Sequence, residues 1–217
     1  MNRREALASV AVASAVLVAD RALAAAPPAA GHGAHGATTS PTANAFEPKP
    51  LPFDPRKLVG LSEKLIVSHH DDNYAGAVKN LAAVRAHLAS TGKDAPGWVV
   101  GGLREKELTY YGSMVLHELY FANLGGDGKA DGPIVKAMPS DWEEKLRATA
   151  LSLGGGSGWA SIDFALHTGE IVVSGSANHT QNVPASIPLL VLDMYEHAYA
   201  IDYGAAHAKY VDAFMQN

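Results

Sequence analysis

Three histidines and one aspartate occupy positions from which they could bind one metal ion. His69 and His117 each fall on the apolar stripe of a segment with helical periodicity. Asp193 follows an apolar run, and His197 lies four residues further on, on the same side of a turn or of a first helical turn. A buried carboxylate is costly unless a cation or hydrogen-bond donors meet it. A site of nitrogen and oxygen ligands suits iron, manganese or zinc.

The composition restricts the chemistry that the chain can perform. Its 217 residues include ten histidines and no cysteine, which excludes disulfides, thiolate metal sites, iron–sulfur clusters and cysteine nucleophiles. The formal net charge is −5 and no basic tract is present, so we expect no nucleic-acid partner. Any tightly held transition metal must therefore rest on imidazole and carboxylate groups.

The N-terminus has the features of an export signal. Arg3 and Arg4 precede a short apolar run over residues 7–19, and Ala22-Leu23-Ala24 ends it with small residues. We predict a signal peptide over residues 1–24, with the paired arginines favouring the twin-arginine route to the periplasm. An ordinary secretory signal and an uncleaved anchor are the alternatives. Once the signal is cleaved, we expect no contact with the membrane, and residues 25–50, rich in Ala, Pro and Gly, should form a flexible linker.

The periodicity of the remaining residues predicts an α+β fold. Helical patterns cover residues 61–90, 104–123, 140–154 and 205–215, with Ser62 as an N-cap and a capping box at residues 140–143. Short apolar or alternating runs at 159–166, 170–174 and 187–192 predict three strands, the first two joined as a hairpin. We therefore expect an N-terminal antiparallel α-hairpin domain over residues 51–126. A C-terminal α/β domain with a small three-stranded antiparallel sheet should follow over residues 127–217.

The segments that carry the four candidate ligands resemble the iron/manganese superoxide dismutase family. The match covers roughly residues 51–217, in the family's order, and includes His-Glu-Leu-Tyr-Phe at 117–121 and Pro-Leu-Leu-Val-Leu-Asp-Met-Tyr-Glu-His-Ala-Tyr at 188–199. The resemblance implies one iron or manganese ion held by His69, His117, Asp193 and His197 with a solvent ligand. It implies the conversion of superoxide to oxygen and hydrogen peroxide by redox cycling of that ion.

The resemblance also assigns residues around the metal. The loop Asn-His-Thr-Gln-Asn at 178–182 is similar to the family version in which a loop histidine orients the metal-bound solvent, which gives this role to His179 and favours iron. Trp159, Phe121 and Tyr195 are expected to form an apolar wall. Glu196 corresponds to a glutamate that bonds across a homodimer to the equivalent of His197.

Several positions depart from the family pattern. Ala77 stands where the family has a gateway tyrosine, and Asn73 stands where it has a histidine. Asp72 and His207 replace cations that draw superoxide to the site, and weaker electrostatic focusing predicts a slower enzyme. Tyr74 lies about 140° around an α-helix from His69 at 100° per residue, which favours an unrelated packing role for its phenol.

Two other functions remain compatible with the residues alone. A non-haem iron oxygenase would use two histidines and one carboxylate, leaving one of the three histidines off the metal. A non-catalytic metal-binding relative would keep all four ligands but would not turn over superoxide. The changes at Asn73 and Ala77 keep the second alternative open.

Overall fold

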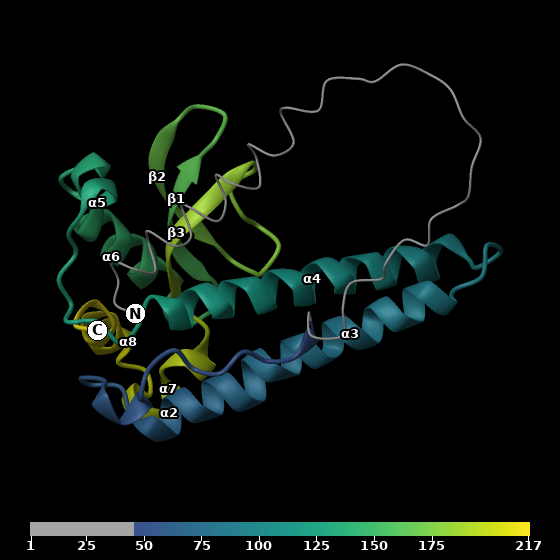
Figure 1. Cartoon of the computed structure of the whole chain (residues 1–217), viewed down its shortest axis with the longest axis horizontal. Coiled ribbons are helices and arrows are strands. Elements are labelled where there is room, and N and C mark those ends of the chain that lie inside the picture. The colour runs from purple at the N-terminus through teal and green to yellow at the C-terminus, as the bar shows by residue number, and fades with distance from the viewer. Residues whose placement is uncertain (1–45) are drawn as a thin grey trace, which may run out of the picture.

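The N-terminal part of the fold is a long antiparallel pair of helices. The computed structural model describes residues 46–217, so the predicted export signal and most of the predicted linker lie outside the described residues. Helix α2 (Glu63–Ser68) continues through a π-helical segment (His69–Tyr74) into α3 (Ala75–Ser90), and α4 (Gly97–Ala122) returns alongside. Figure 1 shows α3 and α4 extending together beyond the rest of the molecule. The predicted α-hairpin is confirmed.

The helix ends follow local chemistry with two differences from the sequence prediction. Ser62 caps α2 as predicted, its hydroxyl accepting the N–H of Leu65 at 3.1 Å. Helix α4 begins at Gly97, directly after Pro96, and not near residue 104. Glycines make residues 97–102 weak helix formers, and tertiary contact with α3 overrides that propensity.

The C-terminal part combines short helices with one antiparallel sheet, as expected. The strands are β1 (Trp159–Ala165), β2 (Glu170–Ser176) and β3 (Ser186–Asp193), in the order β2-β1-β3. The helices of this part are α5 (Pro133–Ala137), α6 (Trp142–Leu153), α7 (Ala200–Tyr203) and α8 (His207–Met215). The α+β class is confirmed, whereas α5 and α7 had no sequence prediction because both are too short to show periodicity.

The start of α6 differs from the predicted capping box. Asp141 occupies the N-cap position but its side chain makes no capping hydrogen bond. Its carboxylate instead lies 3.0 Å from the Nζ atom of Lys145, one turn further on. The predicted capping box is therefore wrong, and Asp141 forms a charge pair along the helix instead.

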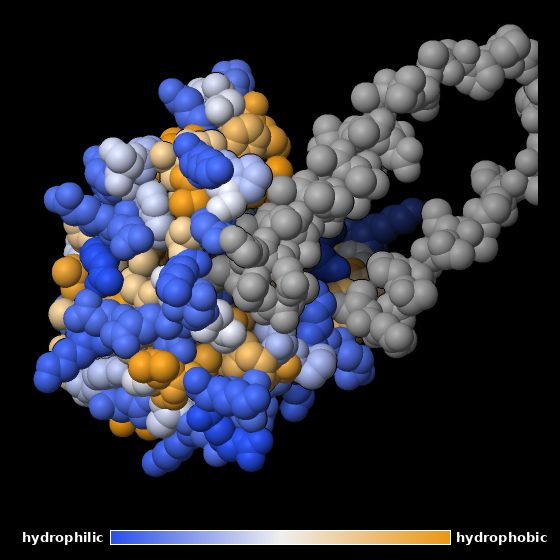
Figure 2. All heavy atoms as spheres, turned by 60° about the vertical axis from the view of Figure 1, so that its left-hand side comes forward, coloured by the Kyte–Doolittle hydropathy of each residue, from blue (hydrophilic) through white to orange (hydrophobic). Residues whose placement is uncertain are grey.

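The core brings the metal-site segments together between the helices and the sheet. Helix α4 contacts both α3 and β3, and α6 contacts β1 and β2. In the sheet register, Trp159 at the start of β1 lies opposite Asp193 at the end of β3. None of the described helices is both long enough and apolar enough to cross a membrane. The face drawn in Figure 2 is largely hydrophilic, with apolar residues in scattered patches.

Candidate metal centre

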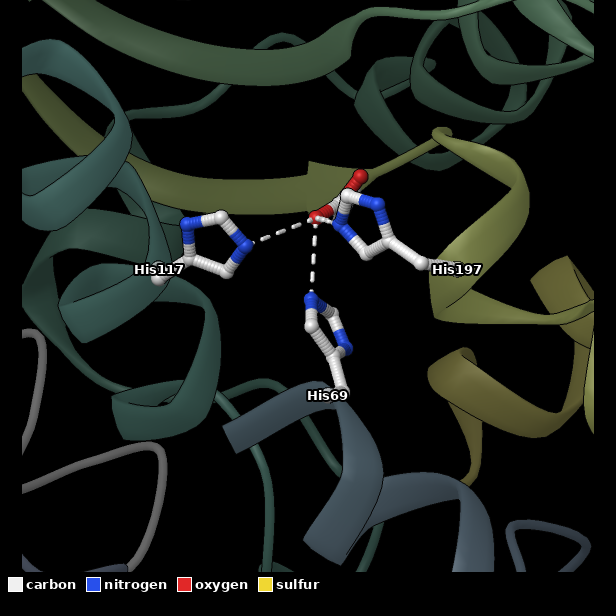
Figure 3. Close-up of side chains that lie close together, drawn as sticks. His69, His117 and His197 are labelled. Atoms are coloured by element: carbon white, nitrogen blue, oxygen red, sulfur yellow. Dashed lines mark hydrogen bonds and ion pairs between the residues drawn. The ribbon is translucent and has the colours of Figure 1, made fainter. Parts of the chain in front are cut away.

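The four residues singled out in the sequence converge on one point. The Nε2 atoms of His69, His117 and His197 lie 3.1, 3.6 and 3.2 Å from the same oxygen, Oδ2 of Asp193. Figure 3 shows the three imidazole rings turned toward that oxygen from three different elements. Ligand atoms about 2.1 Å from a common ion, at angles of about 90–120°, are separated by about 3.0–3.6 Å. The donor set and its spacing therefore fit a single transition-metal ion.

Burial sets the protonation states that a metal site requires. The side chains of His69, His117 and Asp193 are at most 1% exposed, whereas that of His197 is 26% exposed. Burial lowers the pKa of His69 and lowers that of His117 to about 3. Burial opposes ionisation of Asp193, but hydrogen bonds to His197 and His69 outweigh it and lower the pKa of the carboxyl. Neutral imidazoles beside a carboxylate form the ligand state.

Backbone groups fix the orientation of two of the four side chains. His117 donates its Nδ1 proton to the carbonyl oxygen of Ser113 at 2.7 Å, which leaves the Nε2 lone pair free. That Nε2 atom is buried and has no hydrogen-bond partner among the described residues, as expected of an atom that serves as a metal ligand. Oδ1 of Asp193 accepts the N–H of Tyr195 at 2.8 Å, so only Oδ2 faces the histidines.

Comparison with known proteins identifies relatives of this chain. A family model for the C-terminal domain of iron/manganese superoxide dismutases matches residues 138–217. A protein of Cupriavidus metallidurans named as an iron superoxide dismutase is 45% identical over 179 residues, covering 79% of this chain and 91% of that protein. The chain belongs to the iron/manganese superoxide dismutase family. An iron superoxide dismutase of Aquifex pyrophilus is 32% identical over 79% of this chain and 86% of its own length. A manganese superoxide dismutase of Haloarcula marismortui is 29% identical over 77% and 86%.

The four converging residues are the ones that the resemblance to the superoxide dismutase family singled out. An oxygenase site of two histidines and one carboxylate would leave one histidine elsewhere, but all three histidines face Asp193. The structure therefore offers a site with four protein ligands, as the family resemblance implies.

The predicted apolar wall surrounds the cluster. The ring of Phe121 lies 5.1 Å from that of His69, and the ring of Trp159 lies 5.2 Å from that of His117, edge to face. Tyr195 stacks on His197 with ring centroids 5.3 Å apart. Each of the three rings therefore lies against one of the histidines of the cluster.

His179 lies beside the cluster, on the loop between β2 and β3. The indole Nε1–H of Trp159 donates to Nδ1 of His179 at 3.0 Å. The imidazole stacks on Tyr195 with centroids 4.8 Å apart, and its centroid is 6.2 Å from that of His117. Burial lowers the pKa of His179. The loop histidine is thus near the cluster without belonging to it.

The other positions singled out in the sequence do not belong to the ligand cluster. Asn73 is half-buried, and its side chain makes no hydrogen bond to the rest of the described chain. Ala77 is buried in α3. Asp72 accepts a hydrogen bond from Ser68, and His207 contacts the carbonyl of Ala205. Glu196 is exposed next to His197.

Tyr74 has a more specific environment than helical periodicity indicated. The π-helical segment widens the turn at residues 69–74, so Tyr74 does not lie where 100° per residue places it. Its buried hydroxyl donates to Glu118, the neighbour of His117, at 3.0 Å and accepts the backbone N–H of Lys49 at 2.9 Å. The Tyr74 hydroxyl therefore links the segment before α2 to helix α4 by hydrogen bonds. The sequence analysis expected only a packing role for this side chain.

Sequence reasoning missed two tyrosines that support the site. The hydroxyl of Tyr210 donates to the backbone carbonyl of Asp193 at 2.7 Å, and the ring of Tyr120 lies 4.9 Å from that of His69. Tyr120 is three residues after His117 on the same helix, a spacing that could have indicated a shared face. No local signal places Tyr210, because its partner lies 17 residues away.

Proposed function

We propose that this chain is a superoxide dismutase that converts superoxide to oxygen and hydrogen peroxide, with one iron or manganese ion bound by His69, His117, Asp193 and His197. When bound, the ion supplies redox cycling between its +2 and +3 states. The convergence of three imidazole nitrogens on Oδ2 of Asp193 carries the proposal. Membership of the family supports the substrate. Iron is favoured, because the relative at 45% identity is named as an iron enzyme.

His179 is the residue whose Nε2–H group donates a hydrogen bond to solvent in the metal site. An indole N–H can only donate, so Nδ1 of His179 acts as the acceptor of the bond from Trp159. Burial favours the neutral imidazole, whose single proton then sits on Nε2. Nε2–H is the group that can donate to solvent in the site, and the stacking on Tyr195 holds the ring in one plane.

The test of this role is turnover per bound metal in His179→Ala. Loss of such an orienting hydrogen bond typically costs about 10–100-fold, so turnover should fall by that factor while metal content stays near that of the unaltered protein. His167→Ala removes an exposed histidine from the β1–β2 turn and is the matched control. Equal turnover in His179→Ala and His167→Ala at equal metal loading would remove His179 from the mechanism.

The protein acts as a homodimer joined near Glu196 and His197. His197 is the only one of the four ligands with substantial exposure, at 26%, and the exposed Glu196 precedes it. A second copy packed over Glu196 and His197 would exclude water from the metal site. It would also place its own Glu196 carboxylate beside His197. Glu196→Ala should raise the dimer dissociation constant in sedimentation and lower metal content, whereas Glu170→Ala on the exposed edge of β2 should do neither. A wild-type monomer in sedimentation would contradict the dimer.

Residues 1–24 direct the chain to the periplasm by the twin-arginine route. The basic start, short apolar run and small-residue end support this assignment. Replacing both Arg3 and Arg4 with lysine should leave the precursor in the cytoplasm, measured by fractionation and N-terminal sequencing. Unchanged periplasmic yield would point to the ordinary secretory route.

A further inference from the structure

The helix that carries His117 closely approaches the loop that carries His179 at Gly112. An ideal Cβ atom built on Gly112 of α4 would lie 2.1 Å from the carbonyl oxygen of His179, 3.1 Å from its carbonyl carbon and 3.4 Å from its Cβ. All three of the nearest atoms belong to His179, and the closest is backbone. Any side chain at position 112 therefore meets the one loop residue whose position the mechanism uses.

The carbonyl of His179 is also held by a hydrogen bond within the loop. The amide Nδ2 of Asn182 donates to that carbonyl at 3.3 Å. Oδ1 of Asn178 accepts the backbone N–H of Thr180 at 2.9 Å and its hydroxyl at 2.8 Å, which closes a local turn around His179. The carbonyl thus lies between the loop's own amide and the bare Cα of Gly112.

If a side chain is added at position 112, the loop must yield, because the helix cannot. Ser113, Leu116 and His117 of α4 are all buried, and His117 is fixed by its bond to Ser113. The loop residues Thr180, Gln181 and Asn182 are exposed. The His179 carbonyl would need to retreat by about 1 Å to leave even a tight contact, and a misplacement of about 1 Å can cost about 10²-fold in rate.

The other glycines inside α4 show that the contact is particular to Gly112. Gly101 and Gly102 have nothing within 4 Å of an added Cβ. Glycine in a helix interior is unfavourable compared with alanine, so position 112 keeps a residue that weakens the helix. The close approach of the His179 loop gives a structural reason for it.

We propose that Gly112 is a positioning residue for His179: its missing side chain lets the loop seat the imidazole between Trp159 and Tyr195, beside the metal ligands. This inference rests on the proposed role of His179. Gly112 touches neither substrate nor metal ligand in this arrangement and acts only through the loop. Substitution at 112 should therefore change the placement of His179 before it changes metal binding.

The experiment compares Gly112→Ala with Gly102→Ala in the metal-loaded protein. The first readout is the indole N–H hydrogen bond of Trp159, followed by ultraviolet resonance Raman spectroscopy and assigned with Trp159→Phe. Gly112→Ala should weaken this bond, because His179 Nδ1 moves away from the indole, whereas Gly102→Ala should leave it unchanged. The second readout is turnover per bound metal, which should fall about tenfold or more in Gly112→Ala alone.

A double variant separates positioning from general damage. If Gly112 acts only through His179, Gly112→Ala/His179→Ala should turn over at the rate of His179→Ala, whereas independent defects would multiply. Should Gly112→Ala fail to fold, Gly112→Ala/Asn182→Ala frees the carbonyl to move and is measured against Asn182→Ala alone.

The outcomes distinguish this inference from the proposed function. An unchanged Trp159 signal in Gly112→Ala overturns the positioning role, whatever His179→Ala does to turnover. A weakened signal with unchanged turnover in both Gly112→Ala and His179→Ala supports the positioning of the ring and overturns the role of His179 in catalysis.

Discussion

The four ligands and His179 meet at the same site but are held by different kinds of structure. His69, His117 and Asp193 project from a helical segment, a long helix and the end of strand β3, and all three are buried. His179 projects from a partly exposed loop and depends on one bond to Trp159, one stacked ring and one close backbone contact. Metal binding and the solvent-orienting role that we propose for His179 therefore rest on different contacts, and substitutions should affect one without the other.

The largest effect should follow removal of the carboxylate at the centre of the ligand cluster. Asp193→Asn replaces the charged oxygen that faces three imidazoles with a neutral amide, so metal affinity and superoxide turnover should both fall by more than the roughly 10–100-fold that loss of a ligand's hydrogen-bond partner costs. Metal analysis and a turnover assay on the same sample measure this. Asp163→Asn is the matched control, since that buried carboxylate on β1 accepts the hydroxyls of Ser161 and Ser174 and is not part of the ligand cluster. Full metal content in Asp193→Asn would contradict the site.

The ligand cluster should also make the metal-free protein sensitive to acid. Burial lowers the pKa of His117 to about 3 and lowers that of His69, while an unfolded histidine titrates near 6.5. Between these values the unfolded chain binds protons that the folded chain does not. The free energy of unfolding should therefore fall as the pH drops below about 6.5, by up to about 1.4 kcal/mol per pH unit for each buried histidine.

Urea unfolding of the metal-free protein between pH 7 and pH 4 measures this slope. His117→Gln should remove its share of the pH dependence, whereas His167→Gln, at the exposed turn, should not. A flat stability over this range would show that the imidazoles are not held neutral by burial.

The hydrogen bond that holds His179 can be removed without changing a metal ligand. Trp159→Phe keeps an aromatic ring against His117 but removes the N–H that donates to His179. Turnover per bound metal should fall roughly tenfold, with metal content unchanged. Trp142→Phe alters a buried indole at the start of α6 and should leave turnover unchanged. An equal loss of metal and turnover in Trp159→Phe would mean that the two functions are not separable there.

The smallest effect on turnover should come from removing the hydroxyl of Tyr74. Tyr74→Phe leaves the backbone N–H of Lys49 and one carboxylate oxygen of Glu118 without a partner. The free energy of unfolding should fall by about 1 kcal/mol, and turnover per metal should stay within about twofold. The exposed Tyr111→Phe is the control for stability. A large loss of turnover would instead make Tyr74 a participant in proton delivery.

The positions of the metal-ligand residues on their helices and strand were largely predictable, because they follow from sequence patterns over a few residues. Helical periodicity placed His69 and His117 on buried faces, and the apolar run before Asp193 placed that carboxylate at a strand end. The hairpin of β1 and β2 and its turn, with Gly169 at a φ of 71°, followed from turn residues and alternation. Hydrophobic pattern and backbone preference act over a few residues, so the sequence alone carries them.

The tertiary structure decided what distant segments do to one another. The π-helical turn that directs Tyr74 toward Glu118, the bond from Tyr210 to Asp193 and the seat of His179 against Gly112 have no local signature. Gly112 precedes His179 by 67 positions, and nothing around either residue indicates that they touch. The sequence determined which groups can bind the metal, because that depends on residue type and period. Packing determined where the His179 ring lies, because that depends on close contacts between elements far apart in the chain.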